Sequence, residues 1–412
     1  MNAELIEIDD ARQRVLDCTT PLPSERVRLA DALGRVLAEG VGSDGPIPPF
    51  DSSAMDGFAL RFADVCEAGA ERPVRLSVVA ESRAGHPSAR AVGAGEAVAI
   101  STGAIVPPGA DAIVPVERTH AHNGHVDVLA AVPAGNDVRR AGEDIGAGQP
   151  VLAAGEVLGP AQLGVLASVG RAQLACSRRP RLALLTTGDE LVEPGHELPR
   201  GSIYNSNSYA VAALAREAGA EVQPTATARD RTETTSAAIS DALADCDVLV
   251  ICGGVSVGAH DHVKASLAAL GVEQRFWGVA LKPGKPTWFG LRDRTLVFGL
   301  PGNPVSAIVT FTLFVAPALR ALAGAAADAA RTTATIAVDY AKPAGRAHAV
   351  RCRLRAGDTG WTAAPTGAQG SHVLTSMLDA DALALIPSQS TGVRAGERVV
   401  VELLPGARPG FG

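Results

Sequence analysis

Two lysines stand out in this sequence because the chain otherwise uses arginine for its positive charge. Only four of its 37 basic residues are lysines, and two of these fall in the run Lys282-Pro283-Gly284-Lys285-Pro286. An ammonium group is a compact point charge, whereas a guanidinium is a planar fork, so the two are not interchangeable at an anion site. A plain turn is the simpler interpretation of the run, but the residues around it favour a specific role for Lys282 and Lys285.

The other residues suited to chemistry lie in loops that carry glycines and carboxylates. Glycine loops before helices expose backbone N–H groups to an anion, and the helix dipole favours negative charge there. Carboxylates in the same cleft repel an anion unless a hard cation lies between them, and Mg²⁺ with phosphate is the usual arrangement. The loops predict a site for a phosphorylated or oxyanionic substrate. They are Asp189-Glu190, Arg229-Asp230, Gly253–Gly258 with Asp261, and Pro301–Pro304, while Ser206 and Ser256 can add hydroxyl donors.

The elements that must position these loops alternate between strands and helices from Pro180 onward, which predicts a parallel sheet with right-handed crossovers. Ligands bind outside the carboxyl ends of strands in such sheets, and all of the loops fall there. Taken singly, Thr187-Gly188-Asp189 is equally well a turn, and Asp230 and Asp261 are equally well helix caps. Asn303 and Pro304 suit the start of a helix. The expected strands are 181–187, 221–228, 247–252, 272–279 and 295–300, and the expected helices are 208–218, 232–244, 262–270 and 304–322.

The fold class that we expect is multidomain, because 412 residues are too many for one core. Helical spacing predicts a discontinuous N-terminal helical domain from residues 1–46 and 145–176. Short β-like runs predict an inserted β-rich domain over 47–144, followed by a three-layer α/β domain with a mostly parallel sheet (177–325) and a small C-terminal β domain (331–412). In the inserted domain, Asn123-Gly124 predicts a hairpin bracketed by His120, His122 and His125, which favours a surface turn over a metal site.

Composition excludes several classes of function. The net charge of −7 and the lack of a long basic run argue against a nucleic-acid partner. The apolar run Val305–Leu319 is interrupted by polar residues and predicts a buried core helix, not a membrane span. No basic segment begins the chain, and the six cysteines contain no C-x-x-C pair, so we expect a cytoplasmic protein with reduced thiols. No G-x-G-x-x-G motif follows an expected strand, and Gly284-Lys285 is followed by Pro286 instead of Ser or Thr, so the sequence indicates neither an ordinary dinucleotide fold nor a P-loop.

Recognisable motifs occur along nearly the whole chain. They are Pro49–Phe58, Thr102-Gly103-Ala104, Arg139–Ile145, Thr186–Leu191, Gly253–Gly258 with Asp261, Lys282–Pro286, Gly299–Ser306 and Gln369-Gly370-Ser371-His372. Together they resemble those of the molybdopterin molybdenumtransferase family, the MoeA type, which is similar also to the E-domain of gephyrin. Two positions depart from the usual pattern: Ser52 stands where Asn is frequent, and Phe58 where Tyr is common.

The resemblance implies an enzyme that uses Mg²⁺, cleaves adenylylated molybdopterin in the presence of molybdate, releases AMP and leaves molybdenum on the dithiolene. It also implies a homodimer whose cleft combines the α/β domain of one subunit with the inserted domain of the other, and the upstream molybdopterin adenylyltransferase as a partner. The implied catalytic residues are Asp56, Thr102, Asp144, Asp189, Glu190, Lys282 and Lys285. The implied substrate-binding residues are Arg139, Ser206, Gly253, Gly254, Ser256, Pro286, Pro301, Ser306, Arg351 and Ser371, and the implied metal ligands are Glu190, Asp230 and Asp261.

Three alternatives differ in what they require of the sequence. The related enzyme that adenylylates molybdopterin would be a single α/β domain, which the additional domains disfavour. A non-catalytic scaffold should carry a linker and a second domain or lose its carboxylates, and this chain does neither. A tungstate-handling relative has the same sequence requirements, because tungstate and molybdate are nearly isosteric.

Overall fold

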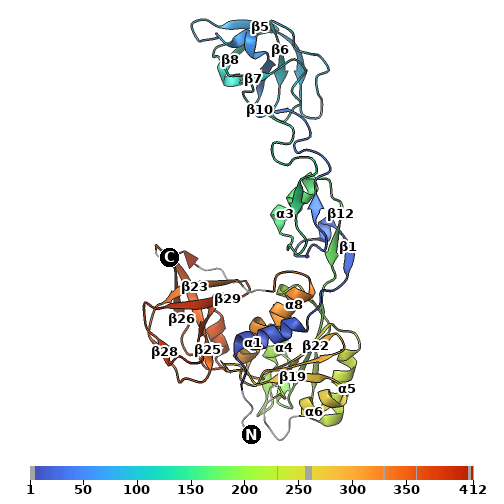
Figure 1. Ribbon diagram of the computed structural model, residues 1–412, viewed down its shortest axis with the longest axis vertical. Helices are drawn as coiled ribbons and strands as arrows, with labels where there is room; N and C mark the ends of the chain where they lie inside the picture. Colours follow the sequence, from blue (N-terminus) through green and yellow to red (C-terminus); the bar gives the residue numbers. More distant parts are fainter. Residues whose placement is uncertain are drawn as a thin grey trace.

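The computed structural model describes residues 5–229, 231–255, 262–327, 330–358, 360–406 and 410–411. The chain is elongated (Figure 1): a β-rich domain occupies one end, a small module lies in the middle, and an α/β domain and a C-terminal β domain lie at the other end. Asp230, Ser256 and Asp261, three of the predicted site residues, fall outside the described ranges.

The α/β domain is built on a sheet with the strand order β16-β13-β18-β22-β21-β19, in which β17 also pairs with β13. Strands β13, β16, β17, β18 and β22 run parallel, whereas β21 is antiparallel to both of its neighbours. The mostly parallel sheet is as predicted, although the expected strand 221–228 is divided in two. The strands are β13 (Arg181–Thr187), β16 (Glu221–Val222), β17 (Ala226–Ala228), β18 (Val248–Cys252), β19 (Glu273–Trp277), β21 (Trp288–Arg292) and β22 (Thr295–Leu300).

Helices cover both faces of this sheet because its central strands are apolar on both sides. Leu182 and Leu184 of β13 face one core cluster, and Ala183 and Leu185 face the other. The predicted three-layer arrangement is therefore present. The first face carries α1 (Ile8–Asp17), α4 (Ser206–Glu217), α7 (Pro304–Thr310), a π-helical turn (Phe311–Val315) and α8 (Ala316–Leu322), and the second carries α5 (Thr232–Leu243) and α6 (His262–Ala269).

The apolar segment Pro304–Leu322 is the core helix that the sequence predicted. It is long and apolar enough to cross a membrane, but most of it is buried inside the α/β domain. Asn303 and Pro304 begin the helix as expected, yet the Asn303 side chain makes no capping hydrogen bond. Its amide instead donates to Ser371 Oγ at 2.9 Å, which ties the helix start to the C-terminal domain.

The N-terminal module corrects one expectation. Helix α1 packs on the α/β domain through Ile8, Ala11 and Val15, and Arg12 donates to both oxygens of the fully buried Glu402 at 3.0 and 2.8 Å. The expected helical domain is instead a mixed module, because Pro21 and Pro23 prevent the helix from continuing and the chain becomes extended. The module contains β1 (Ser24–Arg28), a 3₁₀ turn (Leu29–Asp31), β2 (Val41–Gly42), β11 (Pro150–Leu152), α3 (Pro160–Ser168) and β12 (Gln173–Ser177).

The inserted domain is a six-stranded sheet with the order β7-β4-β6-β5-β9-β8. The predicted hairpin is confirmed: Asn123 and Gly124 join β8 to β9 with φ of 43° and 76°, as a tight hairpin turn requires. The elements are β3 (Ser52–Ser53), β4 (Gly57–Leu60), α2 (Phe62–Val65), β5 (Val74–Ser82), β6 (Glu96–Ile100), β7 (Ala112–Pro115), a 3₁₀ turn (Val116–Arg118), β8 (Thr119–His122), β9 (His125–Val128) and β10 (Val138–Arg139).

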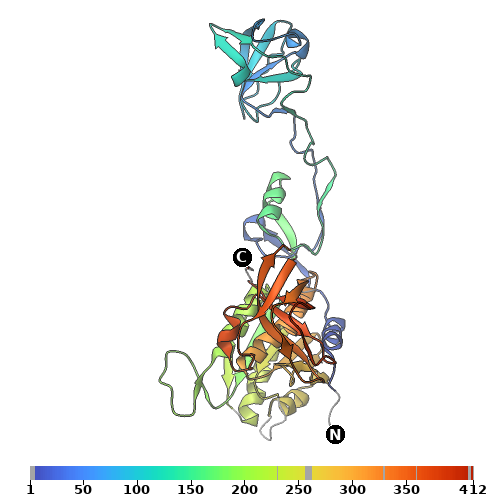
Figure 2. The ribbon, with the colours of Figure 1, turned by 90° about the vertical axis from the view of Figure 1, so that its left-hand side faces the viewer.

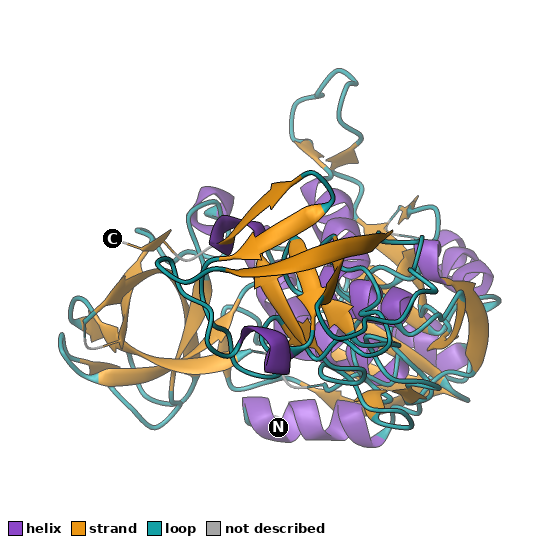
Figure 3. Cartoon of the chain, turned by 90° about the horizontal axis from the view of Figure 1, so that it is seen from above, coloured by secondary structure: helices purple, strands orange, loops and turns teal. Residues whose placement is uncertain are grey.

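The C-terminal strands curve into a closed sheet (Figure 3), in which β25 pairs with both β26 and β27. A short strand of the lysine loop, β20, joins this sheet with Lys282 opposite His348. Lys282 is thus held where the α/β and C-terminal domains meet. The elements are β20 (Leu281–Lys282), β23 (Arg331–Ile336), β24 (Tyr340–Ala341), β25 (Ala347–Gly357), β26 (Gly360–Pro365), a 3₁₀ turn (Leu374–Met377), β27 (Ala382–Ile386), β28 (Gly392–Val393), β29 (Arg398–Leu403) and β30 (Gly410–Phe411).

Candidate functional site

A cavity of about 720 Å³ lies at the carboxyl ends of β13, β18 and β22. Its walls come from the loop after β13, the start of α4, the loop after β22 and, from the C-terminal domain, His372 and Leu374. The short strands β14 (Leu191–Val192) and β15 (Ile203–Tyr204) form one rim, and the loop between them projects from the domain (Figure 2). The volume is in the range of sites for small ligands and cofactors.

Glycines make the first wall possible. The Glu190 carboxylate folds back over Gly188, where an added Cβ would lie 2.5 Å from Glu190 Oε2. Gly253 and Gly254 have φ of 98° and 62°, and a Cβ on either would come within 3.0 Å of Thr187 Oγ1. Side chains at these three positions would therefore close the cavity edge, which accounts for the glycine-rich loops.

The start of α4 forms the second wall. Asn205 caps the helix, since its side-chain oxygen accepts from Ser208 N at 3.2 Å. Its amide nitrogen lies 3.0 Å from both Thr186 Oγ1 and Glu193 Oε1, so it ties the helix to β13. Asn207 reaches in the other direction and donates to Gly302 O at 2.7 Å. Sequence reasoning named Ser206, which does line the cavity, but missed the two asparagines that flank it.

The lysine loop lies beside this cavity through Pro286. Gly284 has φ of 123°, and a Cβ there would meet Thr310 Cγ2 at 2.6 Å, so the loop packs closely on α7. Lys282 and Lys285 are exposed, and across the described chain neither side-chain ammonium has a hydrogen-bond or ion-pair partner. Burial first, and then the charge of Lys282, lowers the pKa of His348 from 6.5 to about 4. Among the described residues, neither lysine ammonium is therefore paired with a carboxylate.

The C-terminal domain adds a loop around Ser371, whose backbone carbonyl accepts from Val305 N at 3.2 Å. Arg351, which we expected to bind substrate directly, is fully buried behind this loop. Its guanidinium donates to the carbonyls of Ala368, Gln369 and Gly370 and to Ser376 Oγ. The structure therefore corrects the expected role: Arg351 positions the loop, and its guanidinium faces the loop carbonyls.

The predicted residues of the inserted domain do not reach this cavity within one chain. Asp56 accepts hydrogen bonds from Thr102 N at 2.7 Å and Thr102 Oγ1 at 3.0 Å, and these bonds, the backbone one first, lower the Asp56 pKa. Arg139 lies on β10 and Asp144 follows it, both exposed. This domain and the α/β domain lie at opposite ends of the chain (Figure 1).

The structure thus gathers only part of the predicted site. Glu190, Ser206, Gly254, Pro286 and Pro301 line the cavity. Seven other predicted residues lie on the same or neighbouring elements without lining it: Asp189, Gly253, Lys282, Lys285 and Ser371, with Ser306 on α7 and Arg351 on β25. Thr187, Tyr204, Asn207 and His372 line it without having been assigned a role. Their signal in the sequence is weak: Thr187 and His372 lie inside the recognised motifs but were given no role there, and Tyr204 and Asn207 flank Ser206 outside the motifs. Among the residues that the structure covers, no three His, Cys, Asp or Glu side chains gather as a metal site.

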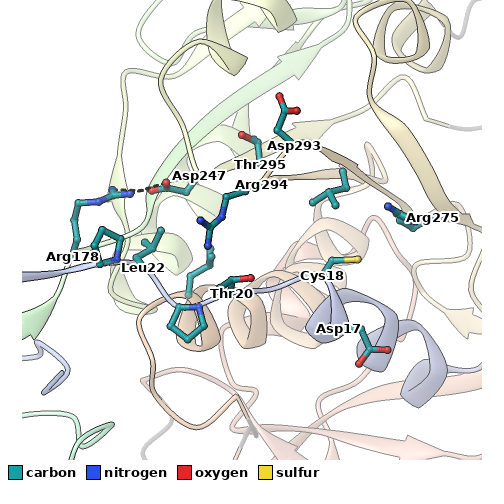
Figure 4. Close-up of a pocket in the computed structure, with 14 residues that line it drawn as sticks. Asp17, Cys18, Thr20, Leu22, Arg178, Asp247, Arg275, Asp293, Arg294 and Thr295 are labelled. Carbon is teal, nitrogen blue, oxygen red and sulfur yellow. Dashed lines mark hydrogen bonds and ion pairs between the residues drawn. The ribbon is translucent and has the colours of Figure 1, made fainter. Parts of the chain in front are cut away.

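A second cavity of about 660 Å³ lies at the opposite, amino-terminal edge of the sheet (Figure 4). It contains none of the residues that the sequence analysis assigned to the site. Its charged groups include Arg178 and Asp247, which form an ion pair with two contacts of 2.9 and 2.8 Å. The two cavities therefore differ in the residues that line them, and the motif residues lie at the cavity of the carboxyl edge.

Comparison with known proteins gives matches along the entire chain. Residues 6–170 match the family of the MoeA N-terminal region (domain I and II), residues 183–321 a probable molybdopterin binding domain, and residues 333–404 the MoeA C-terminal region (domain IV). The molybdopterin molybdenumtransferase of Haemophilus influenzae is 34% identical over 97% of this chain and 98% of its own length. That of Bacillus subtilis is 35% identical over 97% and 94%.

Solved structures agree with these matches. A crystal structure of the molybdopterin biosynthesis MoeA protein from Pyrococcus horikoshii OT3 superposes with a TM-score of 0.83 at 30% identity, covering 97% of this chain and all of that one. A further sequence relative, a molybdopterin molybdenumtransferase 2 of Mycobacterium tuberculosis, is 38% identical over 91% of this chain and 94% of the relative's length. The chain belongs to the molybdopterin molybdenumtransferase family, the transferases of molybdenum cofactor biosynthesis.

Proposed function

We propose that this chain inserts molybdenum from molybdate into adenylylated molybdopterin and releases AMP. The observation that carries the proposal is the pair of unneutralised lysines, Lys282 and Lys285, beside a cavity lined by the glycine loops of β13 and β18. A dianion needs cations and hydroxyl donors, while the cavity next to it is large enough for a nucleotide-linked heterocycle.

The oxyanion would be held at the junction of the α/β and C-terminal domains. Lys282 and Lys285 supply charge, Pro286 shapes the loop, and Ser306 and Ser371 supply hydroxyls from α7 and from the C-terminal loop. Ser256 would add a third hydroxyl. Arg351 holds the 368–370 backbone through three carbonyl contacts of 3.1 to 3.3 Å, and so fixes the position of Ser371. Fixed donors aimed at a developing charge stabilise a transition state more than mobile ones do.

The pyrophosphate would lie along the glycine loops, with Mg²⁺ bound by Glu190 together with Asp230 and Asp261. The donor chemistry fits, because Mg²⁺ prefers carboxylate oxygens and Gly188 leaves room for the Glu190 carboxylate. When bound, the ion would neutralise the charge that develops as the phosphoanhydride is cleaved. Asp189 and Gly253 belong to the same wall. Asp261→Asn should retain the fold and abolish Mg²⁺-dependent cleavage, whereas wild-type turnover would reduce Asp261 to a helix cap.

The cleft would be completed by a second subunit. Asp56, Thr102, Arg139 and Asp144 lie in the inserted domain, at the far end of the chain from the lysine loop. A two-fold dimer can bring the inserted domain of one subunit to the cavity of the other, and does so identically at both ends.

Co-expression of two inactive variants tests this arrangement. Asp56→Ala and Lys285→Ala chains should each be inactive as homodimers, while mixed dimers contain one intact site. Random pairing makes about half of the dimers mixed, so activity should recover to roughly a quarter of wild type. Separately purified homodimers, mixed without exchange, should stay inactive. No recovery in confirmed heterodimers would refute the shared site.

The assay for the whole proposal is molybdate-dependent release of AMP from adenylylated molybdopterin. We expect release to require molybdate and Mg²⁺, and to be lost without either. Repeating the assay with tungstate distinguishes the two oxyanions, which the site chemistry does not separate. The same proposal places the enzyme in the cytoplasm and makes the adenylyltransferase that produces the substrate its natural partner. Release of AMP that is independent of molybdate would contradict the proposal.

A further inference from the structure

Two residues that line the carboxyl-edge cavity each contain a buried side-chain oxygen with no hydrogen-bond partner among the described residues. These oxygens are Thr187 Oγ1 and Asn207 Oδ1. Within the described residues only three further buried side-chain atoms share this condition, and two of those belong to guanidinium groups that are bonded through their other nitrogens. An unsatisfied buried polar group destabilises a fold, so its presence needs an explanation.

Each of these residues has a bonded counterpart one or two positions away. Thr186 precedes Thr187 on β13, and its hydroxyl lies 3.0 Å from both Thr227 Oγ1 and Asn205 Nδ2. Asn205 precedes Asn207 at the start of α4, and both ends of its amide are bonded. Thr186 and Asn205 therefore join the strand to the helix. Thr187 and Asn207 have the same side chains on the same elements but leave an atom unused.

The orientation of the Asn207 amide limits what it can bind. Its nitrogen donates to Gly302 O at 2.7 Å, and the reverse orientation would place two oxygens together. The free end is consequently an oxygen, which can only accept. A ligand that satisfies it must bring an N–H or O–H donor. Thr187, only 7% exposed, lies beneath the backbone of Gly253 and Gly254, and its hydroxyl can donate or accept.

The surrounding wall suits a flat ring. Leu191, Pro286, Pro301 and Leu374 line the same cavity, and Tyr204 stands at its rim. Fused nitrogen heterocycles combine an apolar face with N–H groups along one edge, so they match an apolar wall that contains a few polar atoms. Molybdopterin and adenine, the two ends of the proposed substrate, both have this chemistry.

We propose that Thr187 and Asn207 recognise the substrate. Asn207 Oδ1 accepts a hydrogen bond from an N–H group of the substrate heterocycle, and the Thr187 hydroxyl forms a hydrogen bond with the same ligand. The inference rests on the proposed function, which supplies the identity of the heterocycle. It assigns a task to two residues that the sequence motifs left without one.

Side-chain variants test the inference through two independent readouts, the unfolding midpoint and the dissociation constants for molybdopterin and for AMP. Thr187→Val removes an unsatisfied hydroxyl, so the midpoint should stay or rise while ligand binding weakens about tenfold. Asn207→Ala should weaken binding by a similar factor. The matched control Thr186→Val removes a bonded hydroxyl and should lower the midpoint. Weaker binding of molybdopterin alone assigns the pair to the pterin, and of AMP alone to the adenylate.

Unchanged affinity for both ligands in Thr187→Val and Asn207→Ala, with tight binding by the wild type, would overturn this inference and leave the proposed function standing. A fall in the Thr187→Val midpoint equal to that of Thr186→Val, without weaker binding, would overturn it as well. Wild-type protein that binds neither molybdopterin nor AMP would contradict the proposed function, and the inference with it.

Discussion

At the amino-terminal edge of the α/β sheet, the Asp247 carboxylate accepts from both terminal nitrogens of Arg178, at 2.9 and 2.8 Å, and from Arg181 N at 2.7 Å. At the carboxyl edge, Lys282 and Lys285 have no such partner among the described residues, and Thr187 and Asn207 each leave a buried atom unbonded. Both edges border cavities of similar volume.

The difference lies in what the polar groups are bonded to. Groups that bond to one another, as Asp247 and Arg178 do, hold strands and connections together. Groups without partners are available to a ligand, and leaving them unpaired lowers the stability of the fold. Cavity volume does not separate the two edges, whereas buried side-chain atoms without a hydrogen-bond partner do: among the described residues that line the two cavities, they occur only at the carboxyl edge.

Removal of both lysine charges should have the largest effect. In Lys282→Met/Lys285→Met, molybdate-dependent AMP release should fall on the order of 1,000-fold at limiting molybdate, because the oxyanion loses both cations. The fold should be retained, since neither ammonium holds another residue. Lys285→Arg should restore little activity, because the guanidinium fork is larger and planar. An unchanged molybdate dependence in the double variant would remove the basis for placing the anion at this edge.

Acidification should destabilise the carboxyl edge through His348. Its folded pKa of about 4 lies below the ordinary value of 6.5, so the unfolded chain binds the proton more tightly. The stability present above pH 6.5 is therefore lost as the pH falls toward 4, by up to about 3 kcal/mol. Lys282→Met should raise this pKa and reduce the loss. NMR titration of His348 measures the pKa directly, and an unchanged His348 pKa in Lys282→Met would show that the Lys282 charge does not act on this imidazole.

Loss of the Asp247 charge should affect stability without affecting chemistry. Asp247→Asn retains the shape but weakens three hydrogen bonds, so the α/β domain should lose about 2 kcal/mol of unfolding free energy. Denaturant unfolding measures this loss, and AMP release per folded molecule should equal that of the wild type. Reduced turnover at unchanged stability would mean that the amino edge takes part in the reaction.

The smallest effect is expected from Arg294, an exposed arginine of the amino-edge cavity with no bonded partner among the residues described. Substitution of Arg294 is a strict test, because the Arg294 guanidinium lacks a bonded partner just as the Lys282 ammonium does. Arg294→Ala should change the unfolding free energy by less than about 0.5 kcal/mol and leave AMP release unaltered. A large loss of activity would show that missing partners alone do not distinguish a site, and that exposure to solvent has to be weighed with them.

The sheet could be predicted from the sequence because its central strands are apolar on both faces and end at glycine or proline. Strands β13 and β22 begin and end where the pattern placed them. The partner of α1 could not be predicted, since an amphipathic helix indicates which face is buried but not against what. Its docking on the α/β domain depends on Leu313 and Glu402, both distant in sequence.

The site was predictable to the level of its loops but not to that of its atoms. The sequence places Asn205 and Asn207 on one turn without indicating which of the two has both ends of its amide bonded. The partners of the Asn205 amide nitrogen include Thr186 and Thr227, which come from two separate strands. Arg351 has the charge expected of an anion ligand, and only the fold brings the 368–370 carbonyls around it. Hydrogen-bond partners contributed by distant segments are the information that the sequence lacks.

Backbone hydrogen exchange with and without adenylylated molybdopterin reports on both edges of the sheet in one experiment, and so shows which edge binds the substrate. We predict slower exchange on ligand addition at the carboxyl edge, over residues 186–193, 203–208, 300–306 and 369–374, with no change at residues 17–23 and 291–295 of the amino edge. Protection confined to residues 17–23 and 291–295 would contradict the account.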